Sequence, residues 1–384
     1  MNYRLCKGVE VSEIGIGCYS LSGVYGKKDV TVFKEMLNRA FELGVNFFDT
    51  AEGYGSAESV LGETVKPYRE DVLIATKVGV KEGVKPNLSD AYITNACEES
   101  LKKLQTDYLD VYQVHFNDLE TPVEETVTAL ENLTDEGKIL HYGLGHLPGE
   151  RVEEYCEKGD VFSILMELSA VARHSRKTLL PLCPKYDTGA IAFSTAGRGL
   201  LTGKVKTPAF DPGDLRNIDP LFQRENLQSG LRIVEKFKEL GKEYDKTPVQ
   251  VAVAWVLSQK GIICALTGPS TIPHLEENVG GSGWSLSSKH LQELEKLFVK
   301  EDEWLKKEQI SSLQKILSHE LPEEFSRAFK DLIYVVETSM LLELIEEKEI
   351  LPVFYELFSL QETQDKAALK PIQKHLYNML CSKL

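Results

Sequence analysis

The sequence lacks several features that would place a protein outside an ordinary soluble compartment. Nowhere in its 384 residues is there an apolar run of the roughly 18 residues that a membrane-spanning helix requires. The N-terminal residues 1–7 lack the apolar core of a signal peptide. The seven cysteines are scattered, without the paired spacing of zinc ligands or of a disulfide framework. We therefore expect a cytoplasmic protein with no membrane contact and no metal site.

Basic residues are also too few for a nucleic-acid-binding surface. The chain carries 44 Lys and Arg against 59 Asp and Glu, which gives a formal net charge of −15. A protein that binds nucleic acid needs a basic face to meet the phosphates. We therefore expect no nucleic-acid partner, which leaves small molecules and other proteins as candidates.

Glycine is absent from the last part of the chain, since all 28 glycines lie at or before Gly283. Beyond about residue 300 the sequence predicts successive helices, with Pro322, Pro352 and Pro371 in their first turns. We therefore predict two domains, a body over 1–300 and an all-α extension over 301–384. The apolar faces of such helices must bury against something. The helices could dock on the body or on a second copy of the chain in a homo-oligomer, or they could form a module that binds a protein partner or covers the substrate pocket.

The body alternates short apolar segments with amphipathic helical ones. The strand candidates are residues 12–17, 46–49, 72–76, 109–114, 139–144, 162–166, 190–193 and 263–266. Strict alternation is typical of parallel strands joined by crossover helices. An open doubly wound sheet is the alternative, but its usual Gly-x-Gly-x-x-Gly turn is missing, because Gly15-x-Gly17 has no third glycine. We therefore predict an α/β fold, a closed (β/α)8 TIM barrel.

Polar residues stand at the ends of three consecutive predicted strands. Asp49 ends the second strand and Tyr54 follows it, Lys77 follows the third strand, and His115 the fourth. Each has a bland explanation when taken alone, such as a solvated strand end, a loop cap or a buried structural histidine. The carboxyl ends of barrel strands meet at one mouth, however, and isolated charges are costly there. The four residues together therefore predict a site.

Proton donation to a carbonyl is the chemistry that this set favours. A phenol is a weak acid at neutral pH. We expect the Lys77 ammonium to lower the pKa of Tyr54 and Asp49 to hold the lysine in place. His115 would orient the substrate oxygen. A cofactor would have to supply the hydride.

Three longer motifs around these residues resemble the aldo-keto reductase family. They are the run from Gly44 to Gly55, the run Ile74-Ala75-Thr76-Lys77, and the run from Asp107 to His115. The resemblance covers about residues 2–290. It implies an NAD(P)H-dependent reductase of aldehydes or ketones in which Asp49, Tyr54, Lys77 and His115 are catalytic. It also implies an N-terminal β-hairpin, formed by 3–5 and 9–11, at the bottom of the barrel.

The resemblance also implies a set of cofactor-binding positions. These are Gly17, Cys18, Tyr19 and Asp49 near the first strands, Phe193, Ser194, Gly199, Leu200, Gly203 and Lys204 after the seventh strand, and Gly268, Pro269, Ser270, Thr271, His274, Glu277 and Asn278 after the eighth. Phe193 stands where the family usually has a tyrosine that stacks on the nicotinamide. A helix N-terminus after the eighth strand suits a phosphate.

The chain departs from the family where the nicotinamide carboxamide binds. Gly145 and His146 replace the usual serine and asparagine after the fifth strand, and Met166 stands at the place of the usual glutamine on the sixth. His146 retains one hydrogen-bonding group. Few basic residues stand at the positions that commonly bind a 2′-phosphate. The family resemblance nevertheless implies NADP(H) rather than NAD(H). The small-molecule substrate itself is not predicted.

Two further functions stay open alongside carbonyl reduction. The altered carboxamide site and the helical extension are also consistent with a cofactor-binding regulatory or interaction protein that turns over little. A redox-neutral reaction with a retained cofactor is the third hypothesis. The insertion after the seventh strand, residues 205–226 with Pro208 among them, is predicted to be a long loop, functional or merely exposed.

Overall fold

The computed structural model of the protein describes residues 1–26, 28–80, 85–205, 207 and 209–384. Pro208, part of the predicted insertion, lies outside the described residues. The chain divides into two compact units. The first comprises Met1–Lys204 and Val234–Ser288, and the second comprises Val205–Ile233 and Lys289–Leu384.

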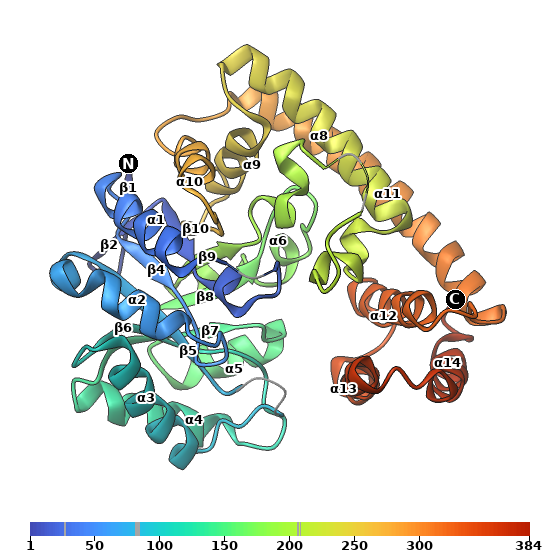
Figure 1. Ribbon diagram of the computed structural model, residues 1–384, viewed down its shortest axis with the longest axis horizontal. Coiled ribbons are helices and arrows are strands. Elements are labelled where there is room, and N and C mark those ends of the chain that lie inside the picture. The colour runs from blue at the N-terminus through green and yellow to red at the C-terminus, as the bar shows by residue number, and fades with distance from the viewer. Residues whose placement is uncertain (27, 81–84, 206, 208) are drawn as a thin grey trace. The chain divides into compact units, whose positions relative to one another are not determined.

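A closed barrel of eight parallel strands forms the first unit (Figure 1). The strands are β3 (Ile14–Gly17), β4 (Phe47–Asp49), β5 (Leu73–Val78), β6 (Leu109–Val114), β7 (Ile139–Gly145), β8 (Ser163–Glu167), β9 (Gly189–Phe193) and β10 (Ile262–Thr267). Neighbours in the ring follow chain order, and β10 closes on β3. The predicted TIM barrel is confirmed.

Helices follow the strands as the apolar periodicity predicted. The helices of this unit are α1 (Val30–Glu42), α2 (Ala57–Val65), α3 (Asp90–Leu104), α4 (Val123–Asp135), α5 (Gly149–Lys158), α6 (Ser175–Thr178), α7 (Leu182–Lys185), α9 (Pro248–Leu257) and α10 (Ile272–Val279). Short 3-10 helices are η1 (Tyr19–Ser22), η2 (Lys66–Asp71) and η3 (Gly197–Thr202). Asp29 shows how such a helix begins, since its carboxylate accepts the backbone N–H groups of Thr31 and Val32.

An N-terminal hairpin, β1 (Tyr3–Cys6) and β2 (Val9–Ser12), closes one end of the barrel, as predicted. Cys6 and Val11 join the core inside the barrel, with Phe47, Ala75, Val111, Phe162, Leu165, Ile191, Ile263, Cys264 and Leu266. Arg4 fastens the hairpin by donating to the carbonyl oxygens of Leu257 and Ile262 at 2.8 and 2.6 Å. The interior is therefore packed, and only the opposite end is a mouth.

The second unit combines the predicted insertion with the C-terminal helices. Its elements are η4 (Leu215–Asn217), η5 (Pro220–Phe222), the first part of α8 (Arg224–Tyr244), α11 (Ser288–Ser318) from Lys289 on, α12 (Phe325–Leu341), α13 (Glu347–Thr363) and α14 (Lys366–Leu380). The residue-300 border that the sequence suggested falls inside α11. The insertion is more than a loop, because Glu225 accepts hydrogen bonds from Ser312 and Tyr334.

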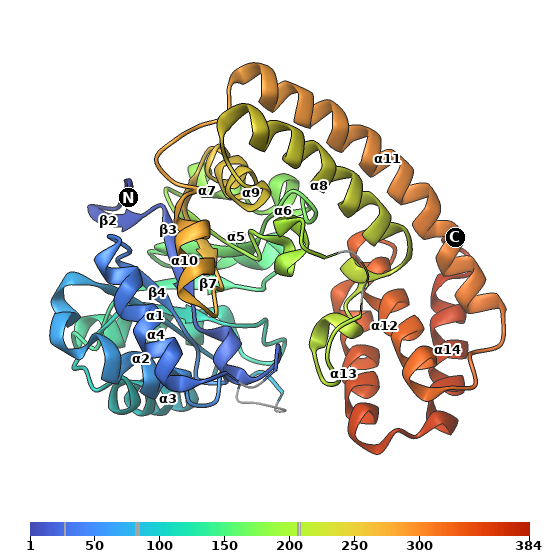
Figure 2. The same cartoon turned by 45° about the horizontal axis from the view of Figure 1, so that its top comes forward.

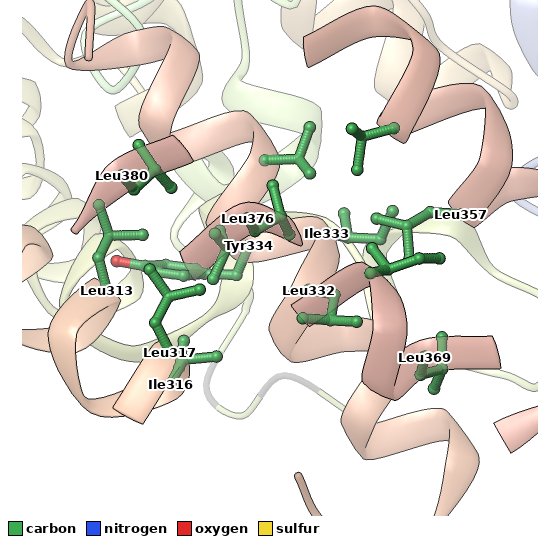
Figure 3. Packing of buried hydrophobic residues seen from close by; sticks show 14 of the residues in the cluster. Leu313, Ile316, Leu317, Leu332, Ile333, Tyr334, Leu357, Leu369, Leu376 and Leu380 are labelled. Carbon is green, nitrogen blue, oxygen red and sulfur yellow. The ribbon is translucent and has the colours of Figure 1, made fainter. Parts of the chain in front are cut away.

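An apolar core holds the C-terminal helices together. Helices α12, α13 and α14 pack against one another (Figure 2). Figure 3 shows side chains of α11 to α14 converging, among them Leu313, Leu332, Leu357 and Leu376, all of which are fully buried. The predicted apolar faces therefore bury largely against each other.

Two of the three C-terminal prolines were placed wrongly by the sequence. Pro352 and Pro371 lie inside α13 and α14 rather than in their first turns, and Pro322 precedes α12. A proline inside a helix removes a single backbone hydrogen bond. Buried residues on either side, such as Ile350 and Leu357 around Pro352, keep the helix continuous. Within the described residues, no helix has both the length and the apolar character to cross a membrane.

Candidate active site

The predicted polar residues gather at the carboxyl ends of neighbouring barrel strands. Asp49 is the last residue of β4, Lys77 is the penultimate residue of β5, and His115 directly follows β6. Because β4, β5 and β6 are adjacent in the ring, their ends share one sector of the mouth (Figure 1). Asp49, Lys77 and His115 are all at most 5% exposed.

Asp49 and Lys77 form a buried ion pair. The Lys77 Nζ atom lies 2.5 Å from Asp49 Oδ1 and donates a second hydrogen bond to the carbonyl oxygen of Thr50 at 2.7 Å. Burial raises the pKa of the Asp49 carboxyl, and the charge of Lys77 opposes that shift. A buried ion pair is costly to form and costlier to break. The Asp49 carboxylate and the Lys77 ammonium are therefore held together at the mouth of the barrel.

Gln113, which the sequence reasoning missed, holds the other carboxylate oxygen. Its Nε2 atom donates to Asp49 Oδ2 at 3.2 Å. Gln113 lies on β6 beside Lys77 on β5 and is fully buried. A signal was present, since Gln113 stands two residues before His115 and therefore points to the same side of the strand.

Tyr54 lies in the loop between β4 and α2, close to the other predicted groups. Its hydroxyl lies 3.5 Å from Nε2 of His115, and its ring centre lies 5.0 Å from Nζ of Lys77. Glu52 anchors this loop by accepting the backbone N–H of Gly79 at 2.8 Å and the hydroxyl of Tyr92. Tyr54 is thus brought together with Lys77 and His115.

The pKa of Tyr54 differs in direction from the sequence-based expectation. Burial raises the pKa of the phenol well above its ordinary value of 10, and the negative charge of Asp49 adds to this effect. Desolvation of the phenolate is the main cause of this shift. The phenol accordingly retains its proton, which is the state required of a proton donor.

His115 is held neutral. Burial lowers the pKa of its imidazole well below 6.5, and the nearby charge of Lys77 lowers it further. Its Nδ1 atom is buried and has no hydrogen-bond partner among the described residues. A neutral imidazole with Nε2 toward Tyr54 can take part in a hydrogen bond with a substrate oxygen.

His146 extends the site into an aromatic cluster. Its ring stacks on Phe116 at 4.7 Å between centroids and lies 4.9 Å from Phe193 and 5.8 Å from His115. The residue adopts a left-handed backbone conformation with φ of 48°. Surrounding protein and the charge of Lys77 lower the pKa of His146 to about 4, although part of the residue is open to solvent. His146 is therefore a neutral, accessible hydrogen-bonding ring.

Most of the predicted cofactor positions follow β9, β10 and β3, which form the adjoining sector of the ring, whereas Glu277 and Asn278 lie farther along, in α10. Several retain surface for a ligand, namely Gly17, Tyr19, Phe193, Ser194, Gly199, Gly203, Gly268, Ser270, Thr271 and His274. A Cβ atom on Gly268 would meet nothing within 4 Å, so this loop leaves open space. Thr271 caps α10 through a bond from the His274 N–H, which marks a helix N-terminus suited to a phosphate.

Other predicted cofactor positions offer little or no side-chain surface. Cys18 and Leu200 are fully buried, Asn278 and Pro269 nearly so, and burial raises the pKa of the Cys18 thiol. Lys204 is an exception, because its side chain is exposed, but its ammonium is already paired with Glu277 at 2.9 Å. Cys18 and Leu200 therefore present no exposed surface to a ligand.

Met166 does not face the barrel interior. Leu165 belongs to the core inside the barrel, and successive side chains of a strand alternate between its faces. Met166, 1% exposed, therefore points toward the surrounding helices, and Leu165 and Glu167 take the inward positions of β8. Its place on β8 therefore does not support a contact between the Met166 side chain and a cofactor in the barrel mouth.

Arg198 and Glu167 form a further polar pair that the sequence reasoning missed. Arg198 Nη2 lies 3.0 Å from Glu167 Oε1, with both side chains partly exposed. The positive charge of Arg198 contributes to the low pKa of His146 and opposes the raised pKa of Tyr19. Its place in the run Gly197–Gly199 was the available signal. Among the described residues, no group of three or more His, Cys, Asp or Glu side chains could hold a metal ion.

Comparison with known proteins agrees with this geometry. Residues 13–298 match the model of the aldo/keto reductase family. A probable aldo-keto reductase of Glycine max is 33% identical over 300 residues, which span 75% of this chain and 86% of that protein. The aldo-keto reductase YhdN of Bacillus subtilis (strain 168) is 32% identical over 297 residues, spanning 75% of this chain and 90% of that one.

Solved structures show the same likeness. A glycerol dehydrogenase from Gluconobacter oxydans superimposes with a TM-score of 0.72 at 27% identity, covering 78% of this chain and 95% of that one. The holo form of an aldo-keto reductase from Bacillus halodurans gives a TM-score of 0.66 at 27% identity, covering 77% and 96%. The family model ends at residue 298, before most of the C-terminal helices.

Proposed function

The chain belongs to the aldo/keto reductase family, and we propose that it reduces an aldehyde or ketone to an alcohol with Tyr54 as the proton donor. The observation that carries this proposal is the grouping of Tyr54 with His115 and with the buried Asp49–Lys77 pair. A nicotinamide cofactor, NADP(H) or NAD(H), supplies the hydride when bound.

Each group has one task in the proposed reaction. The hydroxyl of Tyr54 gives its proton to the carbonyl oxygen as that oxygen gains negative charge. The ammonium of Lys77 stabilises the phenolate that is left, and Asp49 keeps the ammonium in place. The neutral imidazole of His115 holds the substrate oxygen beside Tyr54.

The residues present fit a nicotinamide nucleotide. The partly exposed ring of Phe193 provides a stacking face, and the neutral ring of His146 provides a hydrogen-bonding group near it. The open loop at Gly268 and the α10 N-terminus provide a place for phosphate. At the carboxamide end, Gly145, His146 and Leu165 provide fewer hydrogen bonds than a serine, an asparagine and a glutamine. We expect binding at that end to rest more on stacking.

Tyr54→Phe tests the proton donor. Wild type and variant would be mixed with NADPH or NADH and a panel of aldehydes and ketones, and the loss of cofactor absorbance followed. Removal of the proton donor should lower kcat by about 10²- to 10⁴-fold. Equal rates in the two proteins would refute the assignment. Tight nucleotide binding without turnover in the wild type would favour the regulatory reading instead, and resting protein that carries retained nucleotide would favour a redox-neutral reaction.

We further propose NADP(H) as the preferred cofactor over NAD(H). Lys204 and His274 are exposed cationic or protonatable groups near the adenosine end, although Glu277 bonds to Lys204 and Glu276 bonds to Arg39. A 2′-phosphate would have to displace Glu277 to reach Lys204. The test is the ratio of kcat/KM for NADPH to kcat/KM for NADH. The variant Lys204→Ala should lower kcat/KM for NADPH and leave kcat/KM for NADH unchanged. A higher kcat/KM for NADH would reverse this preference.

A further inference from the structure

We propose that Gln113 is a positioning residue of this active site, holding one oxygen of Asp49 so that Lys77 on the other oxygen stays directed at Tyr54. The inference rests on the proposed reductase function and extends it by one residue. It starts from the division of Asp49 between two donors. Lys77 bonds to Oδ1 at 2.5 Å and Gln113 to Oδ2 at 3.2 Å.

The position of Gln113 is determined by the strand register. Gln113 pairs with Lys77 of β5 on one side and with Gly143 of β7 on the other. Its side chain is fully buried at the level of the ion pair. A carboxylate can only accept, so the nitrogen end of the amide must face Asp49. In this hydrogen bond Gln113 is therefore the donor and Asp49 the acceptor.

A neutral donor suits this place better than the alternatives. Burial raises the pKa of Asp49, whereas the hydrogen bond from Gln113 favours the ionised carboxylate. A second cation at this position would compete with Lys77 for Asp49. An apolar side chain would leave Oδ2 buried without a donor. An amide keeps Asp49 ionised without changing the net charge of the site.

The rest of Gln113 shows no structural reason for an amide. Its Oε1 atom is buried and has no partner among the described residues, as is also true of Ser163 Oγ. A Cβ atom on Gly143 would lie 3.3 Å from Gln113 Cγ and 2.6 Å from Ser163 Oγ, so a glycine between them leaves the room that both side chains occupy. A glutamine retained only for folding would be expected to satisfy both ends. Here the amide serves Asp49 alone.

Gln113→Met, which keeps the length and removes the donor, is the main test. Tyr112→Phe is the matched control, because Tyr112 is a buried neighbour on the same strand whose hydroxyl faces Ile93 of α3. The wild type must first show Tyr54-dependent carbonyl reduction, and kcat and KM are then measured from pH 5 to 9. We expect Gln113→Met to lower kcat about 10- to 100-fold, as loss of a hydrogen bond to a charged group implies.

The pH profile distinguishes positioning from mere packing. Without its donor, Asp49 takes up a proton at higher pH, so the acid limb of kcat should move upward by about one pH unit. KM and nucleotide affinity should stay near their wild-type values. Tyr112→Phe should leave the limb in place.

Gln113→Glu provides a second, opposite readout. While protonated, the new carboxyl donates to Asp49 as the amide does. Once ionised, it repels Asp49 and competes for Lys77. This variant should therefore keep activity at the acid end and lose it as pH rises. It also decides the question if Gln113→Met fails to fold.

The outcomes separate the two proposals. An inactive wild type, or a Tyr54→Phe variant as active as the wild type, would refute the reductase function. Gln113 would then have no catalytic group to position. Active, Tyr54-dependent wild type with unchanged pH profiles in the folded Gln113 variants would overturn the role of Gln113. Failure of both Gln113 variants to fold, with Tyr112→Phe folded, would mark Gln113 as structural and overturn it equally.

Discussion

The two units bury their polar groups in different ways. At the centre of the barrel mouth lie Asp49, Lys77, Gln113 and His115, all at most 5% exposed. The core of the helical unit is mainly leucine, isoleucine and valine, and its buried polar contacts join segments to one another, as Glu225 does with Tyr334. Buried charge that serves no packing purpose is costly. The helical unit also buries carboxylates, but these bond to other segments of the same unit, as Glu225 does with Tyr334 and Glu301 with Arg232, whereas the buried charges of the barrel mouth border the predicted site.

The helical unit joins two distant stretches of the chain. Arg232 pairs with Glu301 at 2.6 Å, Gln309 donates to Asn226 at 2.9 Å, and Arg224 lies 2.5 Å from Asp331. Residues 205–233 leave the barrel directly after the loop that the family resemblance assigns to the cofactor. The insertion is therefore part of the same packed unit as the C-terminal helices.

The largest expected effect comes from removing the barrel's buried cation. Lys77→Met leaves Asp49 without its partner, which should cost about 3–5 kcal/mol of stability and lower carbonyl reduction by at least about 10²-fold. Urea unfolding and the absorbance assay measure the two losses. Lys158→Met, which breaks the exposed pair with Glu124, is the control and should change stability by less than about 1 kcal/mol. Similar effects of both variants would remove the distinction between buried and surface pairs.

Truncation in the helical core should damage stability without damaging the chemistry. Leu332→Ala removes a fully buried side chain and should destabilise the protein by about 2–5 kcal/mol. We expect kcat of the folded variant to stay within about twofold of the wild type, since packing sites rarely enter transition-state stabilisation. Leu341→Ala, 48% exposed on the same helix, is the control. A loss of kcat comparable to that of Tyr54→Phe would show that the units are not functionally separate.

A smaller effect is expected at the contact that joins the insertion to the helices. Tyr334→Phe removes the hydroxyl that donates to Glu225, a carboxylate only 7% exposed, and leaves it with the bond from Ser312. The cost should be about 1–3 kcal/mol. Tyr377→Phe, 44% exposed, should be neutral when both variants are compared by thermal unfolding. Equal melting temperatures of the two variants would contradict the anchoring role.

The smallest effect concerns pH. The pKa of His115 in the folded protein lies well below 6.5, so the unfolded chain binds this proton first as pH falls. Stability is therefore complete above about pH 6.5 and declines below it, by at most about 1.4 kcal/mol per pH unit for one proton. Urea unfolding at pH 7.5 and 5.5 should show a smaller decline in His115→Gln than in the wild type. An identical decline would mean that His115 does not contribute.

Much of the candidate site could be predicted from local sequence pattern. Asp49, Tyr54, Lys77 and His115 could be grouped in advance because strand ends in a barrel converge, and the structure does bring them together. Met166 shows the limit of prediction from local pattern, because a shift of one residue along a strand moves a side chain from the inner face of the barrel to the outer face. The pKa of Tyr54 shows another, because its direction depends on how much water the folded mouth excludes.

By itself the sequence determined the alternation of eight strands with helices, the family, and the four polar residues at or shortly after the ends of three strands. These follow from short-range periodicity and motif. Only the tertiary structure decided that Gln113 reaches Asp49 and that residues 205–233 pack with the C-terminal helices. Both depend on side chains brought together from positions far apart in the chain, where no local pattern records which atoms will meet.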